Sequence, residues 1–583
     1  MARPLVAALR RPRPGLVLGA LAATLLLSAM AGAPDVSDGR ARRTAAPAAQ
    51  GSAAAAAGLR PASRPNVVMV MADDMRADDL RFMPHVRKEL VGTGLTFENS
   101  FSPYPLCCPA RASFLTGRYA HNHHVFSHED PYGFQSFDDR RTLATALRAR
   151  GYRTGFVGKY LNGYGEQRSR VTGRSSFRYV PAGWTDWIGA VSRPPRSRYR
   201  SGGTYNYFHT IFNHDGRIDD THAGEYQTSV LGRFARALVR KYHRRPDPFF
   251  LYLSAVAPHF GGPVELDDPA GVVGPRGGVA RIATPARPDW VKGRFDATIT
   301  RAPGFPADGG PAEADVSDKP RPISHLPEPN AAERAAVRDS TRQRAEALFV
   351  LDREVGRLVA TLKRTGEYDD TVLMFTSDNG YFLGEHRVLQ GKIKPHEPSL
   401  RVPFVMAGKG VPHGRRYDPV TTPGVTATIA ELAGARMPFP LDGTSVLPSV
   451  AADRGWSAPV VTEGLEGSRV FHTAATLSTP GFHDARTTIG VRTARWKYVR
   501  YVDGDAELYD LDRDPAEMTN RYDDPAYATV RADLAAVWRD RKDCVGATCR
   551  APLPPDLQRG PAELGRATRA QAATLTRLYG VPR

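Results

Sequence analysis

The sequence predicts an α/β protein with a large mixed, mostly parallel sheet flanked by helices, followed by a smaller C-terminal subdomain of antiparallel sheet plus helix. Short apolar segments of the buried-strand type recur up to about residue 407, and amphipathic helical segments alternate with them. After about residue 451 the pattern changes to closely spaced pairs of strands. The chain has 583 residues, of which 41% are hydrophobic and 24% charged, as is usual for globular proteins.

The N-terminal segment has the pattern of an export signal. Several arginines come before an apolar run at 15–33 that ends in small residues, and this run contains two possible signal-peptidase sites, Ala29-Met30-Ala31 and Ala31-Gly32-Ala33. An uncleaved membrane anchor is the alternative, because the run is just long enough to span a bilayer. We expect cleavage, a secreted or extracytoplasmic protein, and no stable membrane span in the mature chain.

Composition divides the rest of the chain. Residues 34–64 are rich in Ala, Gly, Ser and Arg and predict a disordered linker. The α/β domain is expected over 65–450. Within it, Pro and Gly interrupt every periodic pattern at 261–326, which indicates a surface insertion. Residues 451–583 form the predicted C-terminal subdomain.

The predicted elements follow one another in a regular order. In the α/β domain they are a strand at 66–71, a helix at 142–150, a strand at 154–158, a helix at 225–242, a strand at 248–253, a helix at 331–364 and strands at 371–376 and 402–407. In the C-terminal subdomain they are strands at 487–493, 496–502 and 507–511 and a helix at 527–541. Strands separated by helices predict parallel pairing, and strands joined by short turns predict antiparallel pairing.

The chain carries a formal net charge of +18, and removal of residues 1–33 would leave +14. This excess favours polyanionic partners such as a sulfated polysaccharide. The alternative is an arginine-rich composition whose charges are simply solvated. No block of lysine and arginine is interleaved with aromatic residues, which argues against a nucleic-acid partner.

Polar residues gather at the ends of four predicted strands, where ligands bind in open α/β sheets. They are Asp73, Asp74, Lys159, His259, Asp378 and Asn379. The three carboxylates and the amide offer hard oxygen ligands, so we expect one divalent cation, Ca²⁺ before Mg²⁺, rather than zinc. Taken singly, each acidic pair is more typical of a turn or a helix cap.

Four cysteines are present. Cys544 and Cys549 enclose a short loop, and in an exported protein they predict a local disulfide. Cys107 and Cys108 are adjacent, and a buried pair, a redox centre and metal ligands are the ordinary explanations. Adjacent cysteines rarely form a good disulfide, and the chain offers neither CxxC spacing nor a second thiol cluster.

The segment 106–117, LCCPARASFLTG, resembles the sulfatase signature Cys-x-Pro-x-Arg followed by Leu-Thr-Gly, in a family that belongs to the alkaline phosphatase superfamily. In that signature the first cysteine is oxidised to formylglycine. The resemblance implies that Cys107 is converted and that a formylglycine-generating enzyme is a maturation partner. Blocks at 66–74, 158–162, 257–259, 377–380, 391–403 and 496–515 resemble other family segments, so the resemblance covers nearly all of 65–545.

The resemblance implies hydrolysis of sulfate esters by a formylglycine diol at position 107 beside a divalent cation. The implied metal ligands are residue 107, Asp73, Asp74, Asp378 and Asn379. Arg111 would steady the diol and the metal carboxylates, Lys159 and Lys392 would neutralise the sulfate, and His259 would protonate the leaving oxygen or take the diol proton. A helix expected at 109–115 would add anion stabilisation at its N-terminus.

One departure from the family pattern concerns the substrate. Many sulfatases have a histidine that touches the sulfate where this chain has Leu161. The wording GKYLN, NHH and DCVGATC instead resembles the N-acetylglucosamine-6-sulfatase branch, which implies 6-sulfated glucosamine of glycosaminoglycans. Asn162, His123 and His386 are candidate substrate-binding residues, although structural histidines are the more common case.

Two other functions stay open at this point. Related enzymes use the same formylglycine to hydrolyse phosphodiesters or phosphonate monoesters. A basic extracellular protein could also bind sulfated polysaccharide without cleaving it, in which case Cys107 would stay unconverted.

Overall fold

The computed structural model describes residues 64–192, 201–465 and 481–582, which belong to one compact unit, Ala48–Arg583. The predicted export signal and all of the predicted linker except Arg64 lie outside the described residues. Within the parts of the chain that the structure describes, no helix combines the length and apolar character needed to cross a membrane.

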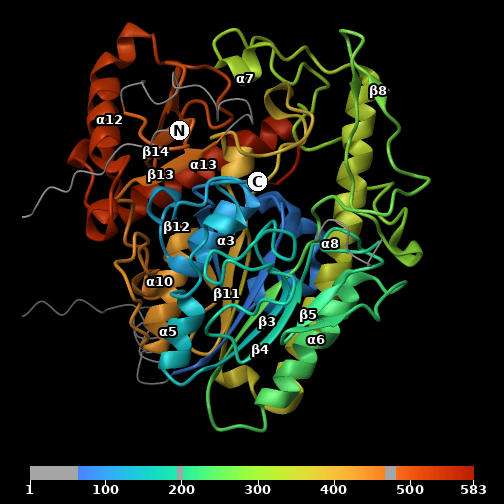
Figure 1. The fold of residues 1–583 in the computed structure, drawn as a ribbon. Helices are drawn as coiled ribbons and strands as arrows, with labels where there is room; N and C mark the ends of the chain where they lie inside the picture. Colours follow the sequence, from blue (N-terminus) through green and yellow to red (C-terminus); the bar gives the residue numbers. More distant parts are fainter. Residues whose placement is uncertain (1–63, 193–200, 466–480, 583) are drawn as a thin grey trace, which may run out of the picture. The chain divides into compact units, whose positions relative to one another are not determined.

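A ten-stranded mixed sheet has the strand order β12-β2-β11-β10-β1-β7-β3-β4-β5-β6 (Figure 1). Its strands are β1 (Asn66–Ala72), β2 (Leu95–Phe101), β3 (Arg153–Lys159), β4 (Asp186–Ala190), β5 (Phe212–His214), β6 (Arg217–Asp219), β7 (Phe249–Ser254), β10 (Thr371–Ser377), β11 (Phe404–Gly408) and β12 (Gly414–Thr421). The neighbours β10, β1, β7, β3 and β4 are parallel, whereas β11 and β5 run antiparallel to their neighbours. The predicted mixed, mostly parallel sheet is confirmed.

Helices cover both faces of this sheet (Figure 1). Val68 and Val70 of β1 lie in the core formed with α6 (Gln227–Tyr242) and α8 (Ala331–Thr365). The alternate residues of β1 lie in the core formed with α3 (Cys107–Thr116), α5 (Leu143–Ala149) and α10 (Thr422–Ala433). A central parallel strand is buried on both faces, so it is apolar throughout.

Helix α8, which the sequence predicts, has clear start and stop signals at its two ends. At its start the Asn330 side chain accepts from the Glu333 N–H, and the Glu333 side chain accepts from the Asn330 N–H, each at 2.9 Å. This capping box satisfies N–H groups that have no partner within the helix. The helix ends at Gly366, whose φ of 77° suits glycine.

The C-terminal part contains a four-stranded antiparallel sheet. Its strands are β13 (Val460–Gly464), β14 (Thr488–Arg492), β15 (Trp496–Tyr501) and β16 (Ala506–Asp510), and the helices α12 (Ala528–Arg541) and α13 (Pro561–Tyr579) follow. Trp538 of α12 packs on β14 and donates its indole N–H to the Ile489 carbonyl at 2.9 Å. The antiparallel sheet and α12 confirm the expectation, whereas β13 and α13 were not predicted.

The segment 261–326 is largely irregular, in agreement with the sequence pattern. It contains the two-residue strands β8 (Val272–Val273) and β9 (Val279–Ala280) and the short helix α7 (Arg321–Ser324). The remaining short α-helices are α2 (Pro84–Val86), α4 (Ala120–His123), α9 (Glu397–Leu400) and α11 (Leu447–Ala451).

The predicted disulfide between Cys544 and Cys549 is present and buried. The Cys544 carbonyl accepts from His121 Nε2 at 2.7 Å and from the Asn122 amide at 2.8 Å. His121 Nδ1 lies 2.6 Å from the Glu463 carboxylate. The disulfide turn and β13 therefore hold the α4 segment that follows α3.

Glu463 makes this junction sensitive to acid. Burial opposes ionisation of its carboxyl, but His121 and Arg486 outweigh that effect and lower its pKa to about 2. Because the folded-state pKa lies below the unfolded value of about 4.5, the stabilisation is complete above pH 4.5 and is lost as the pH falls towards 2. We expect Glu463→Gln to lower the free energy of unfolding by about 3 kcal/mol at pH 7 and by less than half as much at pH 3.

Denaturant unfolding at the two pH values measures this effect. Glu563→Gln is the matched control, because that carboxylate is exposed and pairs with Arg559 at the protein surface. An equal loss for Glu463→Gln at both pH values would contradict the electrostatic explanation.

Candidate active site

Four adjacent strands bring the predicted polar residues to one edge of the large sheet. Strands β10, β1, β7 and β3 are parallel neighbours, so their carboxyl ends lie together. Asp73 and Asp74 follow β1, Asp378 and Asn379 follow β10, and Lys159 is the last residue of β3. The loop after β7 carries His259 to the same place, 3.6 Å from Asp74.

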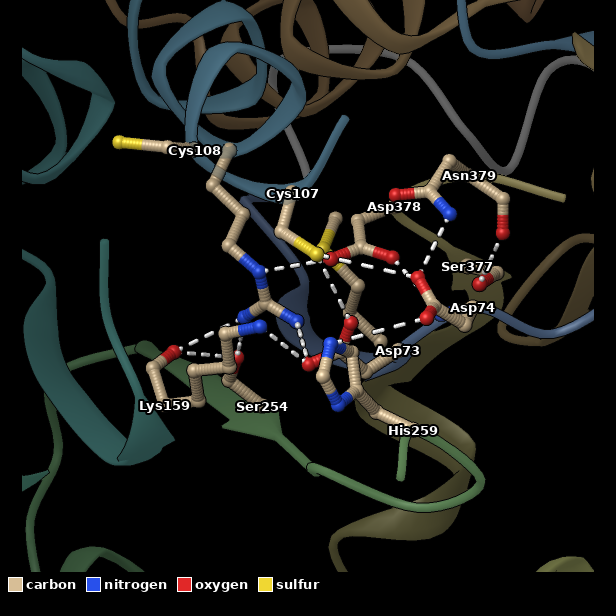
Figure 2. Close-up of polar contacts among 12 residues, drawn as sticks. Asp73, Asp74, Cys107, Cys108, Lys159, Ser254, His259, Ser377, Asp378 and Asn379 are labelled. Carbon is tan, nitrogen blue, oxygen red and sulfur yellow. Dashed lines mark hydrogen bonds and ion pairs between the residues drawn. The ribbon is translucent and has the colours of Figure 1, made fainter. Parts of the chain in front are cut away.

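Cys107 lies in the centre of this cluster (Figure 2). Its Sγ is 3.2 Å from Asp73 Oδ1, 3.8 Å from Asp74 Oδ1 and 2.8 Å from Lys392 Nζ. The helix was expected to start at residue 109, but α3 begins at Cys107 itself. The side chain at position 107 therefore stands at the helix N-terminus, where the free backbone N–H groups favour negative charge.

Cys108 has a different environment although it is the next residue. Figure 2 shows its side chain pointing away from the acidic cluster, and its Sγ lies 3.8 Å from the Asn162 carbonyl. Burial raises the pKa of its thiol to about 12, so it is neutral at ordinary pH. The structure thus distinguishes the two adjacent cysteines by orientation.

The three aspartates form a buried acidic cluster. Burial, followed by repulsion from Asp73, raises the pKa of Asp378. For Asp74, Lys392 and His259 outweigh burial and hold its pKa well below the usual range. Asp74 Oδ2 and Asn379 Oδ1 are buried and have no hydrogen-bond partner among the described residues. Convergent anionic oxygens with such unused acceptors fit the ligand set of a hard divalent cation.

Cationic side chains surround the aspartates. Lys159 Nζ lies 2.5 Å from Asp73 Oδ2, and Lys392 contacts Asp74 as well as the Cys107 thiol. Arg111 donates from Nε to Asp378 Oδ2 at 2.8 Å, and its Nη2 is 3.4 Å from Asp73. The guanidinium therefore joins the acidic residues that follow β1 and β10.

Arg111 is also fixed from the other side of the site. Its Nη1 donates to the Lys159 carbonyl at 2.9 Å and to Ser254 Oγ at 2.5 Å. The side chain is almost fully buried. A planar guanidinium held by this many acceptors has little freedom to reorient, so it fixes the relative positions of β1, β3, β7 and β10.

His259 has the protonation pattern of a neutral imidazole. Its Nδ1 lies 2.7 Å from the Phe260 carbonyl, which can only accept, so Nδ1 carries the proton and Nε2 faces Asp74. Burial, supported by Lys392 and Lys159 and opposed by Asp74, lowers its pKa to about 3. The rings of Tyr205 and Phe260 lie 4.8 and 4.2 Å from the imidazole.

The three candidate substrate-binding residues lie in different surroundings. Asn162 donates to the Tyr205 hydroxyl at 2.5 Å, and its Oδ1 is buried without a hydrogen-bond partner in the described part of the chain. His123 contacts Ser113 Oγ at 2.9 Å and the Val125 N–H at 3.2 Å, one with each ring nitrogen. His386 Nδ1 lies 2.7 Å from a Glu313 carboxylate. For all three, a part in substrate binding stays a prediction.

Sequence reasoning missed four residues of this site. Ser254 and Ser377 are the last residues of β7 and β10. Their positions at strand ends, the same signal that indicated the aspartates, could have predicted them. The Tyr205 ring centroid lies 4.9 Å from Lys159 Nζ, and no motif or strand end in the sequence indicated this residue. His128 has a buried Nε2, and burial, Lys392 and Lys159 hold its pKa well below the usual value.

Most of the chain matches known protein families. The family model described as Sulfatase matches residues 65–435, and the model described as N-sulphoglucosamine sulphohydrolase, C-terminal, matches residues 384–543. The chain is 29% identical to an arylsulfatase of Volvox carteri, covering 84% of this chain and 76% of that protein. It is 27% identical to N-acetylglucosamine-6-sulfatase of Homo sapiens, covering 85% of this chain and 87% of that protein.

Solved structures share the fold. A protein in complex with its substrate D-glucosamine-2-N,6-O-disulfate superposes with a TM-score of 0.59 at 18% identity, covering 82% of this chain and 98% of that one. A phosphonate monoester hydrolase from Silicibacter pomeroyi superposes with a TM-score of 0.57 at 21% identity, covering 85% and 99%. At these identities the likeness concerns the fold alone, so it does not discriminate between sulfate and phosphonate esters.

Proposed function

Because the chain belongs to the sulfatase family, we propose that it hydrolyses sulfate esters of sulfated sugars, such as 6-sulfated glucosamine of glycosaminoglycans. The observation that carries this proposal is the position of Cys107, in contact with Asp73, Asp74 and Lys392 at the start of α3. Similarity to an N-acetylglucosamine-6-sulfatase supports the choice of substrate, as does the GKYLN segment.

The proposal includes maturation and export. A formylglycine-generating enzyme would convert Cys107, and the segment 1–33 would direct secretion before its removal. The proposed domains are a catalytic domain at 65–450, with its insertion at 261–326, and a C-terminal subdomain at 451–583. Conversion matters because a hydrated aldehyde carries two hydroxyls, of which one attacks sulfur and the other later expels sulfate.

Asp73, Asp74, Asp378, Asn379 and residue 107 would hold one divalent cation, Ca²⁺ before Mg²⁺. When bound, such a cation favours the ionised form of a nearby hydroxyl and offsets anionic charge. The buried Asp74 and Asn379 oxygens without hydrogen-bond partners are the support for this assignment.

The other residues have roles that follow from their contacts. Lys392 contacts the side chain of residue 107 and Lys159 contacts Asp73 beside it, so the two ammonium groups would neutralise the sulfate oxygens. Arg111 would hold the aspartates in place. His259 keeps one proton on Nδ1 and presents an unprotonated Nε2 to the site, where it would take the proton of the attacking hydroxyl at residue 107 and pass it to the oxygen of the leaving alcohol.

If His259 has this role, the loss of kcat/KM on its substitution should depend on the leaving group of the substrate. A sugar alkoxide is a poor leaving group that needs a proton, whereas a nitrophenolate departs without one. We expect His259→Ala to lower kcat/KM for a sugar sulfate by about 10²–10³-fold and to lower it for a nitrophenyl sulfate by less than about tenfold. His243→Ala is the control, since His243 makes an exposed pair with Glu367. Equal losses of kcat/KM on both substrates would contradict a role of His259 in proton transfer to the leaving group.

Steady-state kinetics of the converted enzyme test the function itself. We expect a higher kcat/KM for 6-sulfated N-acetylglucosamine than for a phosphonate monoester or a phosphodiester with a matched alcohol. The opposite order would establish the phosphonate or phosphodiester alternative. Binding of sulfated polysaccharide without turnover of any ester, by protein whose Cys107 stays an unmodified thiol after expression with the converting enzyme, would establish the non-catalytic alternative.

A further inference from the structure

The loop after β7 presents an exposed aromatic ring beside His259. Phe260 is 43% exposed, although most large apolar side chains of the described residues are buried. Its ring centroid lies 4.2 Å from that of the imidazole, at an interplanar angle of 32°. One part of the phenyl ring therefore contacts the active-site histidine while the rest is open to solvent.

The backbone around Phe260 is held in place. The Phe260 carbonyl accepts from His259 Nδ1 at 2.7 Å, and the His259 carbonyl accepts from the Tyr207 hydroxyl at 2.7 Å. The Gly262 N–H donates to the Tyr205 carbonyl at 2.9 Å, and the Tyr207 N–H donates to the Gly262 carbonyl at 2.8 Å. The loop backbone is therefore fixed and the ring packs on the imidazole, so little further ordering is needed when a ligand packs on the exposed part of the ring.

The chemistry of Phe260 complements that of the rest of the site. The contacts of residue 107 are carboxylates and an ammonium group, which suit the charged sulfate and its cation. Charged groups of this kind do not make apolar contacts with the carbon skeleton of the sugar that carries the ester. A pyranose ring has a face of C–H groups. Burial of this apolar face against an aromatic ring is favourable in free energy because it removes the face from water.

We propose that Phe260 forms a substrate subsite, in which its exposed ring packs against the C–H face of the pyranose that carries the sulfate ester. This inference rests on the proposed function and adds a contact for the sugar itself. The subsite lies beside the group that protonates the leaving oxygen, so the sugar would be held where its alcohol departs. Phe260 is thus a specificity residue for sulfated sugars over small acyclic sulfates.

Kinetics of Phe260→Ala, Phe260→Tyr and the control Val264→Ala test the subsite. Val264 lies in the same loop and is 90% exposed, but it offers no ring. For 6-sulfated N-acetylglucosamine we expect Phe260→Ala to raise KM about tenfold, with kcat within about twofold of wild type. Phe260→Tyr should restore KM, and Val264→Ala should leave it unchanged. The KM for ethyl sulfate and the inhibition constant of inorganic sulfate should not move in any variant.

The outcomes separate this inference from the function on which it rests. An unchanged KM for the sulfated sugar in Phe260→Ala would overturn the subsite while leaving sulfatase activity intact. A fall in kcat on ethyl sulfate as large as that on the sugar would also overturn it, because Phe260 would then act only by supporting His259. Absence of turnover by converted wild type on every sulfate ester would overturn the function and the subsite together.

Discussion

Replacement of Cys107 by alanine is expected to lower kcat/KM for sulfate esters by more than about 10⁴-fold, as for loss of other enzymic nucleophiles. Residue 107 stands within reach of Asp73, Asp74 and Lys392, and nothing else in the described site is placed to attack sulfur from the same position. Cys107→Ser is expected to be equally inactive in a host whose converting enzyme requires cysteine, since a serine hydroxyl cannot supply the second hydroxyl of a hydrated aldehyde.

Cys108→Ala is the matched control for this loss. The side chain of Cys108 points away from the acidic cluster, so the variant should keep kcat/KM within about threefold of wild type. Circular dichroism and thermal unfolding would show that both variants fold. Activity that survives in Cys107→Ala and disappears in Cys108→Ala would contradict the assignment of the two cysteines.

Asp74→Asn is expected to remove the bound cation and to lower kcat by at least about 10³-fold. Asp74 has a φ of 65°, a conformation that asparagine tolerates well, so the substitution changes charge with little strain. It leaves an amide where Lys392 and His259 now face a carboxylate. Elemental analysis after dialysis should find about one Ca²⁺ or Mg²⁺ per wild-type chain and much less in the variant.

Asp267→Asn provides the control for metal binding. Asp267 belongs to a second group of carboxylates, with Glu265 and Asp268, but that group lies around the buried Arg287 guanidinium. Asp267 pairs with that guanidinium and is half-exposed, so the variant should keep the full metal content. Stoichiometric metal in Asp74→Asn, or loss of metal in Asp267→Asn, would contradict the proposed ligand set.

The central sheet was predictable because its strands are buried on both faces. β1, β7 and β10 are mostly apolar; β7 and β10 end in serine, and Asp73 and Asp74 directly follow β1. Their parallel order then places those termini together. Four metal-ligand candidates, Asp73, Asp74, Asp378 and Asn379, therefore followed from the strand ends, whereas the family resemblance implied residue 107.

Elements with little apolar character were missed. Strand β12 reads GRRYDPVT and lies at the edge of the sheet, where only one neighbour pairs with it. Helix α13 buries Thr568 and Gln571 beside Leu564, so its packed face lacks a clear apolar stripe. Both elements are stabilised by tertiary contacts that local sequence does not encode.

Parts of the site depend on the same long-range contacts. Lys392 lies outside any strand end, so family resemblance alone pointed to it. Tyr205 contacts His259 because backbone hydrogen bonds join the loops at 205–207 and 259–262, and Phe260, the next residue after His259, packs on the imidazole from the same loop. No periodic pattern in the sequence brings these loops together, and their part in the site could be found only from the folded chain.

Mass spectrometry of the peptide that contains residue 107 tests the central claim most directly. The account predicts that protein able to hydrolyse sulfate esters carries an aldehyde at this position, and that specific activity rises in proportion to the converted fraction. Full turnover by protein whose Cys107 remains an unmodified thiol, or no turnover by fully converted, metal-loaded protein, would contradict it.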